Sequence, residues 1–209
     1  MLGKFISFEG IEGSGKSTQI QKLKAFLSSK NINSLTIREP GNTHIGEQIR
    51  QLLQHDPKAH NMCPETELLL FEASRAQLVR ELILPTIQKN IWIICDRFFD
   101  SSTAYQGAAR QLPFEMIHRL NQFAVGKCVP DLTILLDIDV GLVWQRLQGR
   151  REKKDRIESE SMEFFCRVRE KYLRLAEEEP LRFFSIDGTL SEETITEKIC
   201  THLEQRFAL

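Results

Sequence analysis

Apolar residues along this chain form two kinds of pattern, short continuous runs and longer stretches in which they recur every three or four positions. The continuous runs, bounded by turn residues, predict buried strands at 4–9, 35–38, 91–95, 132–138 and 182–186. The periodic stretches predict amphipathic helices at 16–28, 44–54, 65–84, 101–109, 114–125, 140–148, 159–178 and 191–206.

Strands that alternate with helices, several of them apolar throughout, are typical of a parallel sheet covered by helices on both faces. We therefore predict an α/β fold with a five-stranded parallel sheet. A length of 209 residues suits one domain, spanning residues 1–209. In such sheets ligands bind beyond the carboxyl ends of the strands. Chemistry is thus expected directly after Glu9, Arg38, Cys95 and Ile138.

The overall charge excludes some partners. Lys and Arg total 28 and Asp and Glu total 29, and this balance does not indicate binding to nucleic acid or to an anionic membrane. No stretch approaches the roughly 20 apolar residues of a membrane helix, and no secretory signal precedes the first strand. The five cysteines are scattered without a C-x-x-C pair, which indicates reduced thiols. We expect a cytoplasmic protein.

A glycine-rich segment between the first predicted strand and helix carries the strongest chemical signal. It reads GIEGSGKS and fits the P-loop pattern G-x-x-x-x-G-K-[ST], whose backbone N–H groups wrap a phosphate at a helix N-terminus. Lys16 is expected to reach the β- and γ-phosphates of ATP and Ser17 to bind Mg²⁺. A plain glycine-rich turn with a solvent-facing lysine is the alternative. The predicted loop contacts to ATP are Gly10, Ile11, Glu12, Gly13, Ser14, Gly15, Lys16, Ser17 and Thr18.

Charged side chains stand at the carboxyl ends of two further predicted strands. Asp96 has the position of an acid that holds Mg²⁺ beside a P-loop, although a turn aspartate is the alternative. Arg97 and Arg38 face the same crevice, where a guanidinium grips a phosphate bidentately unless each only forms a surface salt bridge. Pro40 and Gly41 force a turn that presents Arg38 there.

Two later features suggest a nucleobase site and a flap. Phe71 and Arg75 lie four residues apart on a predicted helix and share a face, which suits stacking on a base and bonding to its edge. Phenylalanine at this spacing is also common in a core. Segment 149–156 carries five basic residues in eight and is either a solvated loop or a flap over phosphates. Arg146, on the helix before it, is expected to stack beside a purine.

These motifs, in this order, resemble the thymidylate kinase family. The matching blocks are FEGIEGSGKST, REPG, LLLFEASRAQ, DRFFDSSTAYQG, DRIE and RVREKY, and they extend from Phe8 to about Ala176. The P-loop alone is generic, whereas REPG, F-x-x-x-R and DR-x-x-x-S-S-x-x-A-Y-Q-G together are specific. The resemblance implies ATP-dependent phosphorylation of dTMP to dTDP with Mg²⁺, by a homodimer with ATP and dTMP as its partners.

The resemblance also implies roles for individual residues. Glu12 would point at the deoxyribose 3′-hydroxyl, Arg38 and Arg97 would hold the dTMP phosphate, and Ser17 and Asp96 would serve the metal. The implied dTMP contacts are Glu12, Arg38, Pro40, Phe71, Arg75, Arg97, Ser101, Ser102 and Tyr105.

Within the implied dTMP site, four residues would contact the nucleoside. Phe71 would stack on thymine and Arg75 would bond its carbonyl. Ser102 would lie on the thymine edge, and Tyr105 would pack near C2′, where a ribose hydroxyl would clash.

The loop composition also bears on catalysis. One branch of the family has an arginine where Gly13 stands here, and the other supplies the catalytic arginine from a lid. Gly13 followed by a basic segment resembles the second branch, with a mobile lid at about 146–158 and Arg151 as its arginine. The predicted catalytic residues are Lys16, Arg97 and Arg151.

Three other functions compete with this interpretation. A kinase for another nucleoside monophosphate or small acceptor would share the P-loop, but Phe71 and Arg75, the residues expected to contact the base, argue against it. A regulatory GTPase would need an N-K-x-D-type guanine motif, and the sequence has none. An inactive binding protein is disfavoured by the intact P-loop and Asp96.

Overall fold

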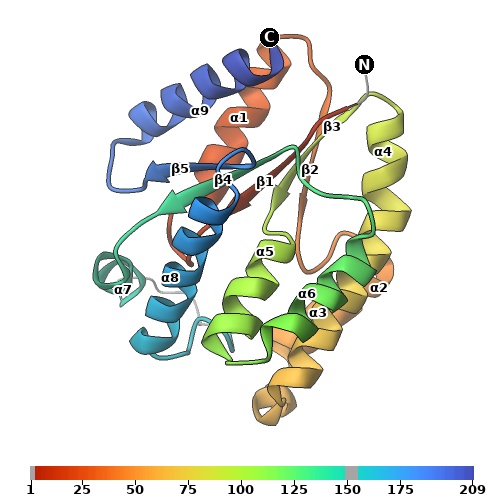
Figure 1. The fold of residues 1–209 in the computed structure, drawn as a ribbon, viewed down its shortest axis with the longest axis vertical. Helices are drawn as coiled ribbons and strands as arrows, with labels where there is room; N and C mark the ends of the chain where they lie inside the picture. Colours follow the sequence, from red (N-terminus) through yellow and green to blue (C-terminus); the bar gives the residue numbers. More distant parts are fainter. Residues whose placement is uncertain (1–2, 149–154) are drawn as a thin grey trace.

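The computed structural model describes residues 3–148 and 155–209, and for residues 146–148 the backbone alone. Five parallel strands form one sheet in the order β2-β3-β1-β4-β5 (Figure 1). The predicted five-stranded parallel sheet is confirmed. The strands are β1 (Phe5–Glu9), β2 (Ser34–Arg38), β3 (Trp92–Asp96), β4 (Leu132–Asp137) and β5 (Phe183–Asp187).

The register of the sheet brings three strand ends together. Phe8 of the central strand β1 lies opposite Asp96 of β3, and Arg38 of β2 lies opposite the same aspartate. Glu9, Arg38 and Asp96 therefore stand side by side at one edge of the sheet. This edge is where sheets of this type bind ligands.

Helices cover both faces of the sheet, because successive side chains of a strand point in opposite directions. Ile6 and Phe8 of β1 pack with apolar side chains of α1 and α9, whereas Phe5 packs on the opposite face. Helices α1 and α9 lie side by side (Figure 1). The other helices pack on that second face or on its helices. The helices are α1 (Lys16–Ser29), α2 (His44–Arg50), α3 (Pro64–Leu78), α4 (Leu84–Gln88), α5 (Phe99–Ser102), α6 (Phe114–Val125), α7 (Val140–Gln148), α8 (Met162–Glu178) and α9 (Glu192–Phe207).

Several predicted helices contain wider π-helical turns, at Gln51–His55, Val79–Ile83 and Thr103–Ala109. The helix predicted to end at about residue 84, before Pro85, instead continues through α4 to Gln88. A proline has no N–H to donate to the preceding turn, and the π-helical turn just before it gives its ring room. That predicted helix end was therefore wrong.

Other features of the fold agree with the sequence. Ser191 begins α9 as its cap, with its hydroxyl accepting a hydrogen bond from the backbone N–H of Thr194. All five cysteines are free thiols, as expected. Among the described residues, no helix is long and apolar enough to cross a membrane.

Candidate active site

A cavity of about 280 Å³ opens at the carboxyl ends of β1, β2 and β3. Most of the residues predicted for the site line it, although they come from segments far apart in the sequence. The predicted residues on its wall are Glu12, Gly13, Gly15, Lys16, Ser17, Thr18, Arg38, Pro40, Phe71, Asp96, Arg97, Ser101, Ser102 and Tyr105. Gly10, Ile11 and Ser14 belong to the same loop but do not line the cavity.

The backbone of the glycine-rich loop requires glycine at two of its positions. Gly10 has φ +138°, and a Cβ there would lie 2.6 Å from the carbonyl oxygen of Leu136. Gly15 precedes the first residue of α1 with φ 94°, a left-handed conformation that glycine adopts without strain. The loop thus leads the chain from β1 to the N-terminus of α1, whose free N–H groups favour an anion.

Lys16 lies beneath this loop and is almost fully buried. Its ammonium donates hydrogen bonds to the carbonyl oxygens of Gly10, at 3.1 Å, and Ile11, at 3.0 Å. Burial and the nearby charge of Arg97 lower the pKa of Lys16. A compact positive charge is therefore held at the base of the phosphate-binding loop.

Arg97 also lines the cavity, next to the P-loop. Its backbone is in the left-handed region, with φ 69°, a conformation that residues other than glycine rarely adopt. Its guanidinium donates to the carbonyl oxygen of Gly10 at 2.9 Å and to Glu12 Oε2 at 2.9 Å. The guanidinium carbon lies 5.0 Å from the ring centre of Tyr105. Arg97 is thereby fixed between the P-loop and an aromatic face.

Arg38 forms the salt bridge considered from the sequence, and its role at a phosphate stays a prediction. Its guanidinium is bonded to both carboxylate oxygens of Glu47, at 2.9 and 3.0 Å, and its side chain is half-exposed. It also lines the cavity. The ion pair orients the guanidinium without burying it, so that the side chain remains accessible to a ligand.

A buried carboxylate lies below Arg97. Glu9 Oε1 accepts a hydrogen bond from the backbone N–H of Phe98 at 2.7 Å, and Oε2 accepts from the hydroxyls of Ser101 and Tyr172, each at 2.7 Å. Burial and the charge of Asp100 raise the pKa of Glu9 to about 7, although Arg97 and the two hydroxyls oppose that rise. No role was predicted for Glu9 or Tyr172 from the sequence.

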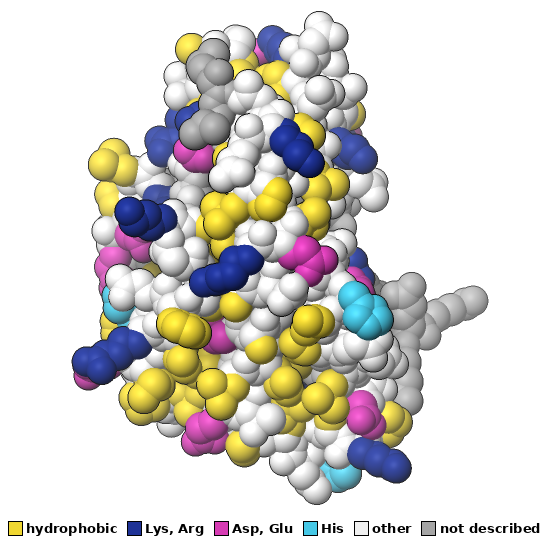
Figure 2. Space-filling view, turned by 90° about the vertical axis from the view of Figure 1, so that its right-hand side faces the viewer, with side chains coloured by type: hydrophobic (Ala, Val, Ile, Leu, Met, Phe, Trp, Pro, Cys, Tyr) yellow, Lys and Arg dark blue, Asp and Glu magenta, His cyan; other side chains and the backbone are white. Residues whose placement is uncertain are grey.

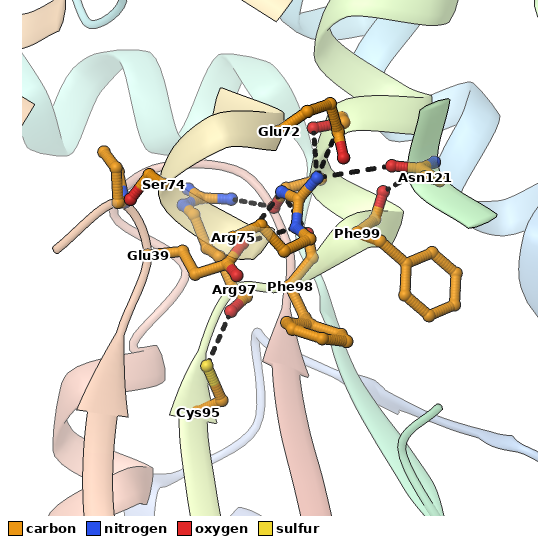
Figure 3. Close-up of polar contacts among 12 residues, drawn as sticks. Glu39, Glu72, Ser74, Arg75, Cys95, Arg97, Phe98, Phe99 and Asn121 are labelled. Atoms are coloured by element: carbon orange, nitrogen blue, oxygen red, sulfur yellow. Dashed lines mark hydrogen bonds and ion pairs between the residues drawn. The ribbon is translucent and has the colours of Figure 1, made fainter. Parts of the chain in front are cut away.

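Arg75 does not line the cavity, in contrast to Phe71 on the same helix. Figure 3 shows its guanidinium enclosed by polar groups from several elements. It forms ion pairs with Glu39 and Glu72, and donates to Ser102 Oγ at 3.0 Å and Asn121 Oδ1 at 3.3 Å. Only 1% of Arg75 is exposed. Its role as a reader of the thymine carbonyl stays a prediction, and its observed contacts join α3 to the segment that follows β2 and to α5.

Other residues that the sequence analysis did not single out also line the cavity. They include Arg50, Gln54, Glu39 and Gln106. Arg50 donates to the carbonyl oxygen of Pro40 at 3.0 Å, and the Oε1 atom of Gln54 is buried without a hydrogen-bond partner among the described residues. Arg50 and Gln54 are four residues apart, so the polar side of the helix predicted at 44–54 held a usable signal.

Residues 155–158, at the end of the predicted lid, are tied to the main body. Arg156 forms an ion pair with the buried Glu67 at 2.6 Å and donates to the carbonyl oxygen of Leu53 at 3.1 Å. Burial alone would raise the pKa of Glu67, but Arg110, Gln106 and Arg156 hold it below its ordinary value. Arg151 and the side chain of Arg146 lie outside the described residues.

Comparison with known proteins agrees with this geometry. Residues 8–199 match the model of the family described as thymidylate kinase. The chain belongs to the thymidylate kinase family. The thymidylate kinase of Kosmotoga olearia is 49% identical over 93% of this chain and 92% of its own. That of Carboxydothermus hydrogenoformans is 44% identical over 98% of each chain.

A solved structure shares the fold. The crystal structure of thymidylate kinase from Ehrlichia chaffeensis superposes with a TM-score of 0.79 and is 32% identical, over 98% of this chain and 99% of its own. Family membership confirms the predicted enzyme class and the reaction, ATP-dependent phosphorylation of dTMP to dTDP. It leaves no place for the regulatory GTPase as the alternative.

Proposed function

We propose that this chain carries out phosphoryl transfer in the described cavity, with ATP on the P-loop and dTMP against Arg97. One observation carries the proposal. Lys16 Nζ and Arg97 Nη1 both donate to the carbonyl oxygen of Gly10, at 3.1 and 2.9 Å. A cation expected on the donor side and a cation expected on the acceptor side therefore share one acceptor atom, which supports a role for both at the bond to be made.

The chemistry asks little of the protein beyond alignment and charge. The acceptor is a phosphate oxygen that is already an anion near neutral pH, so no general base is needed. Lys16 and Arg97 would offset the charge that accumulates between two polyanions, and their fixed positions hold the reactants in line. Glu12 would orient Arg97 by its ion pair, and this contact supports a role for Glu12 at the 3′-hydroxyl of the sugar.

The other side of the cavity suits a deoxynucleoside. Phe71 presents an aromatic face, Ser102 a hydroxyl, and Tyr105 a ring that lies against Arg97. The hydroxyl oxygen of Tyr105 is buried without a hydrogen-bond partner among the described residues. A buried hydroxyl without a hydrogen-bond partner lowers the stability of the fold, so a ligand group that forms a hydrogen bond with it would bind more tightly.

The residues present fit a magnesium ion. Ser17 and Asp96 line the same cavity and offer a hydroxyl and a carboxylate oxygen, the hard ligands that Mg²⁺ prefers. No cluster of three or more acidic, histidine or cysteine ligands occurs in the described part of the chain. This agrees with Mg²⁺ sites that use one or two protein ligands together with substrate phosphates. The ion would neutralise phosphate charge, and a chelator in excess of Mg²⁺ is expected to stop dTDP formation until Mg²⁺ is restored.

A panel of acceptors tests the proposed substrate. With ATP and Mg²⁺, phosphorylation of dTMP is expected to exceed that of dUMP, UMP, CMP, AMP and GMP in kcat/KM. Equal use of a second nucleotide would support the broader kinase instead. Nucleotide hydrolysis without an acceptor separates a hydrolase from a kinase, because the kinase is expected to be nearly silent.

The catalytic arginine is expected on the lid, which we propose spans about residues 146–158. Since Gly13 provides no side chain in the P-loop, Arg151→Ala should lower kcat by about tenfold or more and change the KM for dTMP little. Steady-state kinetics at saturating ATP measure this. A rise in the KM for ATP alone would make Arg151 a ground-state clamp. Arg150 would then be the better candidate, because Arg156 is already paired with Glu67.

Selection against ribose is expected to depend on the ring of Tyr105. If the ring fills the space below C2′, Tyr105→Ala should raise kcat/KM for ribo-TMP relative to dTMP by about 10- to 100-fold, even as both fall. Tyr105→Phe keeps the ring and loses the hydroxyl, so it should retain the wild-type ratio. An unchanged ratio in Tyr105→Ala would show that ribose is excluded by another residue.

We also propose that the chain is a cytoplasmic homodimer. Figure 2 shows apolar side chains gathered on the face turned toward the viewer. Exposed large apolar residues on helices α3 and α6 include Leu69, Phe114, Met116 and Phe123, the last of them 80% exposed. Patches of this kind mark interaction sites more often than scattered apolar residues do. Sedimentation of the purified chain would test the dimer, with Phe123→Lys expected to weaken it.

A further inference from the structure

The carboxylate of Glu9 is fully buried at the end of β1. Its two oxygens accept three hydrogen bonds, from the backbone N–H of Phe98 and from the hydroxyls of Ser101 and Tyr172. The three donors lie 89, 92 and 163 residues from Glu9 in the sequence, the most distant being Tyr172 of α8. A buried carboxylate must have such partners, but their identity shows what it holds in place.

Every one of these three partners is in contact with Arg97 or adjacent to it in the chain. Phe98 is the next residue, so its N–H bond to Glu9 fixes the peptide that follows the left-handed backbone of Arg97. The Ser101 and Tyr172 hydroxyls lie 3.3 and 3.4 Å from Arg97 Nη1. The same two hydroxyls are 2.8 Å from one another. Glu9 therefore supports both the backbone and the guanidinium of Arg97.

We propose that Glu9 and Tyr172 are positioning residues for phosphoryl-acceptor binding, acting through Arg97. The inference rests on the proposed role of Arg97 at the dTMP phosphate. When Glu9 is ionised, its carboxylate accepts a hydrogen bond from each of the two hydroxyls. The lone pairs of the Ser101 and Tyr172 oxygens are then turned toward Arg97 Nη1 and accept hydrogen bonds from it. The guanidinium is then held by oxygens on one edge, and Glu12 holds its other nitrogen at 2.9 Å.

The hydrogen-bond directions make the proposal specific. In Glu9→Gln, the side-chain oxygen must remain toward the N–H of Phe98, which places the amide NH₂ against the two hydroxyls. That NH₂ donates where the carboxylate accepted, so it competes with Arg97 for the same oxygen lone pairs. The variant keeps the size of Glu9 and removes its ability to orient Arg97. Tyr172→Phe removes one of the two oxygens and leaves the ring in the core.

Acceptor kinetics of the purified full-length chain test the proposal. Tyr172→Phe should lower kcat/KM for dTMP by about 5- to 10-fold, the effect of one lost hydrogen bond, and change the KM for ATP by less than about twofold. Glu9→Gln should act in the same direction and by more. The matched control is Ser7→Ala, because Ser7 lies on the same strand and loses a buried bond to Thr133, 2.9 Å long, that does not reach Arg97. The control should change the melting temperature and leave dTMP kinetics unaltered.

A double variant separates positioning from general damage. An Arg97→Lys background lacks the guanidinium nitrogens that make these contacts, so adding Tyr172→Phe should lower kcat/KM for dTMP by less than about twofold further. The same loss in both backgrounds, or a Tyr172→Phe variant that behaves like Ser7→Ala, would overturn the inference. If Arg97→Lys itself leaves dTMP kinetics unchanged, the proposed role of Arg97 fails. That result is distinct from the failure of Tyr172 or Glu9.

Discussion

Replacing Lys16 by alanine is expected to lower turnover by about 10²-fold or more, a few kcal/mol of lost transition-state stabilisation. The ammonium lies at the base of the P-loop and is bonded to the carbonyl oxygens of Gly10 and Ile11. Arg97 bonds only the first of these two oxygens, and water that enters the space cannot offset phosphate charge as a fixed ammonium does. The loss should therefore appear mainly in kcat.

The measurement is steady-state dTDP formation, with folding followed by thermal melting. The melting temperature should fall only modestly, because burial of the ammonium, which lowers its pKa, is itself unfavourable. Lys24→Ala is the matched control, since Lys24 is an exposed lysine on the same helix, α1. Near-normal turnover in Lys16→Ala would contradict the assignment of the P-loop as the ATP site.

Local pattern was enough to predict the parts of the site that stand at strand ends. The P-loop directly follows β1, and Asp96 and Arg97 directly follow the apolar run of β3, so the parallel sheet brings them together without further information. The same holds for Arg38 at the end of β2. Each assignment needed one strand and the residue after it.

The interior of the site could not be predicted in this way, because it depends on long-range contacts. Glu9 and Tyr172 are 163 residues apart and have no common pattern in the sequence. Glu67, which pairs with Arg110 and Arg156, likewise has partners from distant segments. The π-helical turn Val79–Ile83, just before Pro85, also has no signal in the apolar pattern of the segment.

Phe71 and Arg75 show that helical spacing predicts which face of a helix two residues share, but not how deeply each side chain is buried. Residues four apart lie on one side of a helix, but one turn of α3 lies nearer the cavity than the next. Phe71 therefore lines the cavity, whereas Arg75 is buried among acidic side chains. Spacing along the sequence specifies the face of the helix on which a side chain lies. How deeply that side chain is buried depends on which other segments pack against it.

Arg75→Ala is consequently expected to destabilise the fold by about 3–5 kcal/mol, since it leaves two buried carboxylates without a counter-charge. Glu39 and Glu72 are the two carboxylates, and both side chains are almost fully buried (Figure 3). Urea unfolding of wild type and variant measures the difference. Arg174→Ala is the matched control, because Arg174 pairs with Glu170 on the exposed face of α8 and such pairs contribute about 0–1 kcal/mol.

The destabilisation of Arg75→Ala should also depend on pH. In the wild type, burial already raises the pKa of Glu39 from 4.5 to about 7 against the opposing charge of Arg75. Loss of Arg75 raises it further, so the folded variant binds a proton that the unfolded chain releases above pH 4.5. Its stability must then fall as pH rises, and the deficit relative to wild type should be smaller at about pH 5 than at about pH 8. If Arg75→Ala were as stable as wild type and had lost only dTMP binding, the prediction would be contradicted. Arg75 would then contact the base without stabilising the fold, and Glu39 and Glu72 would be buried without a counter-charge at no cost in stability.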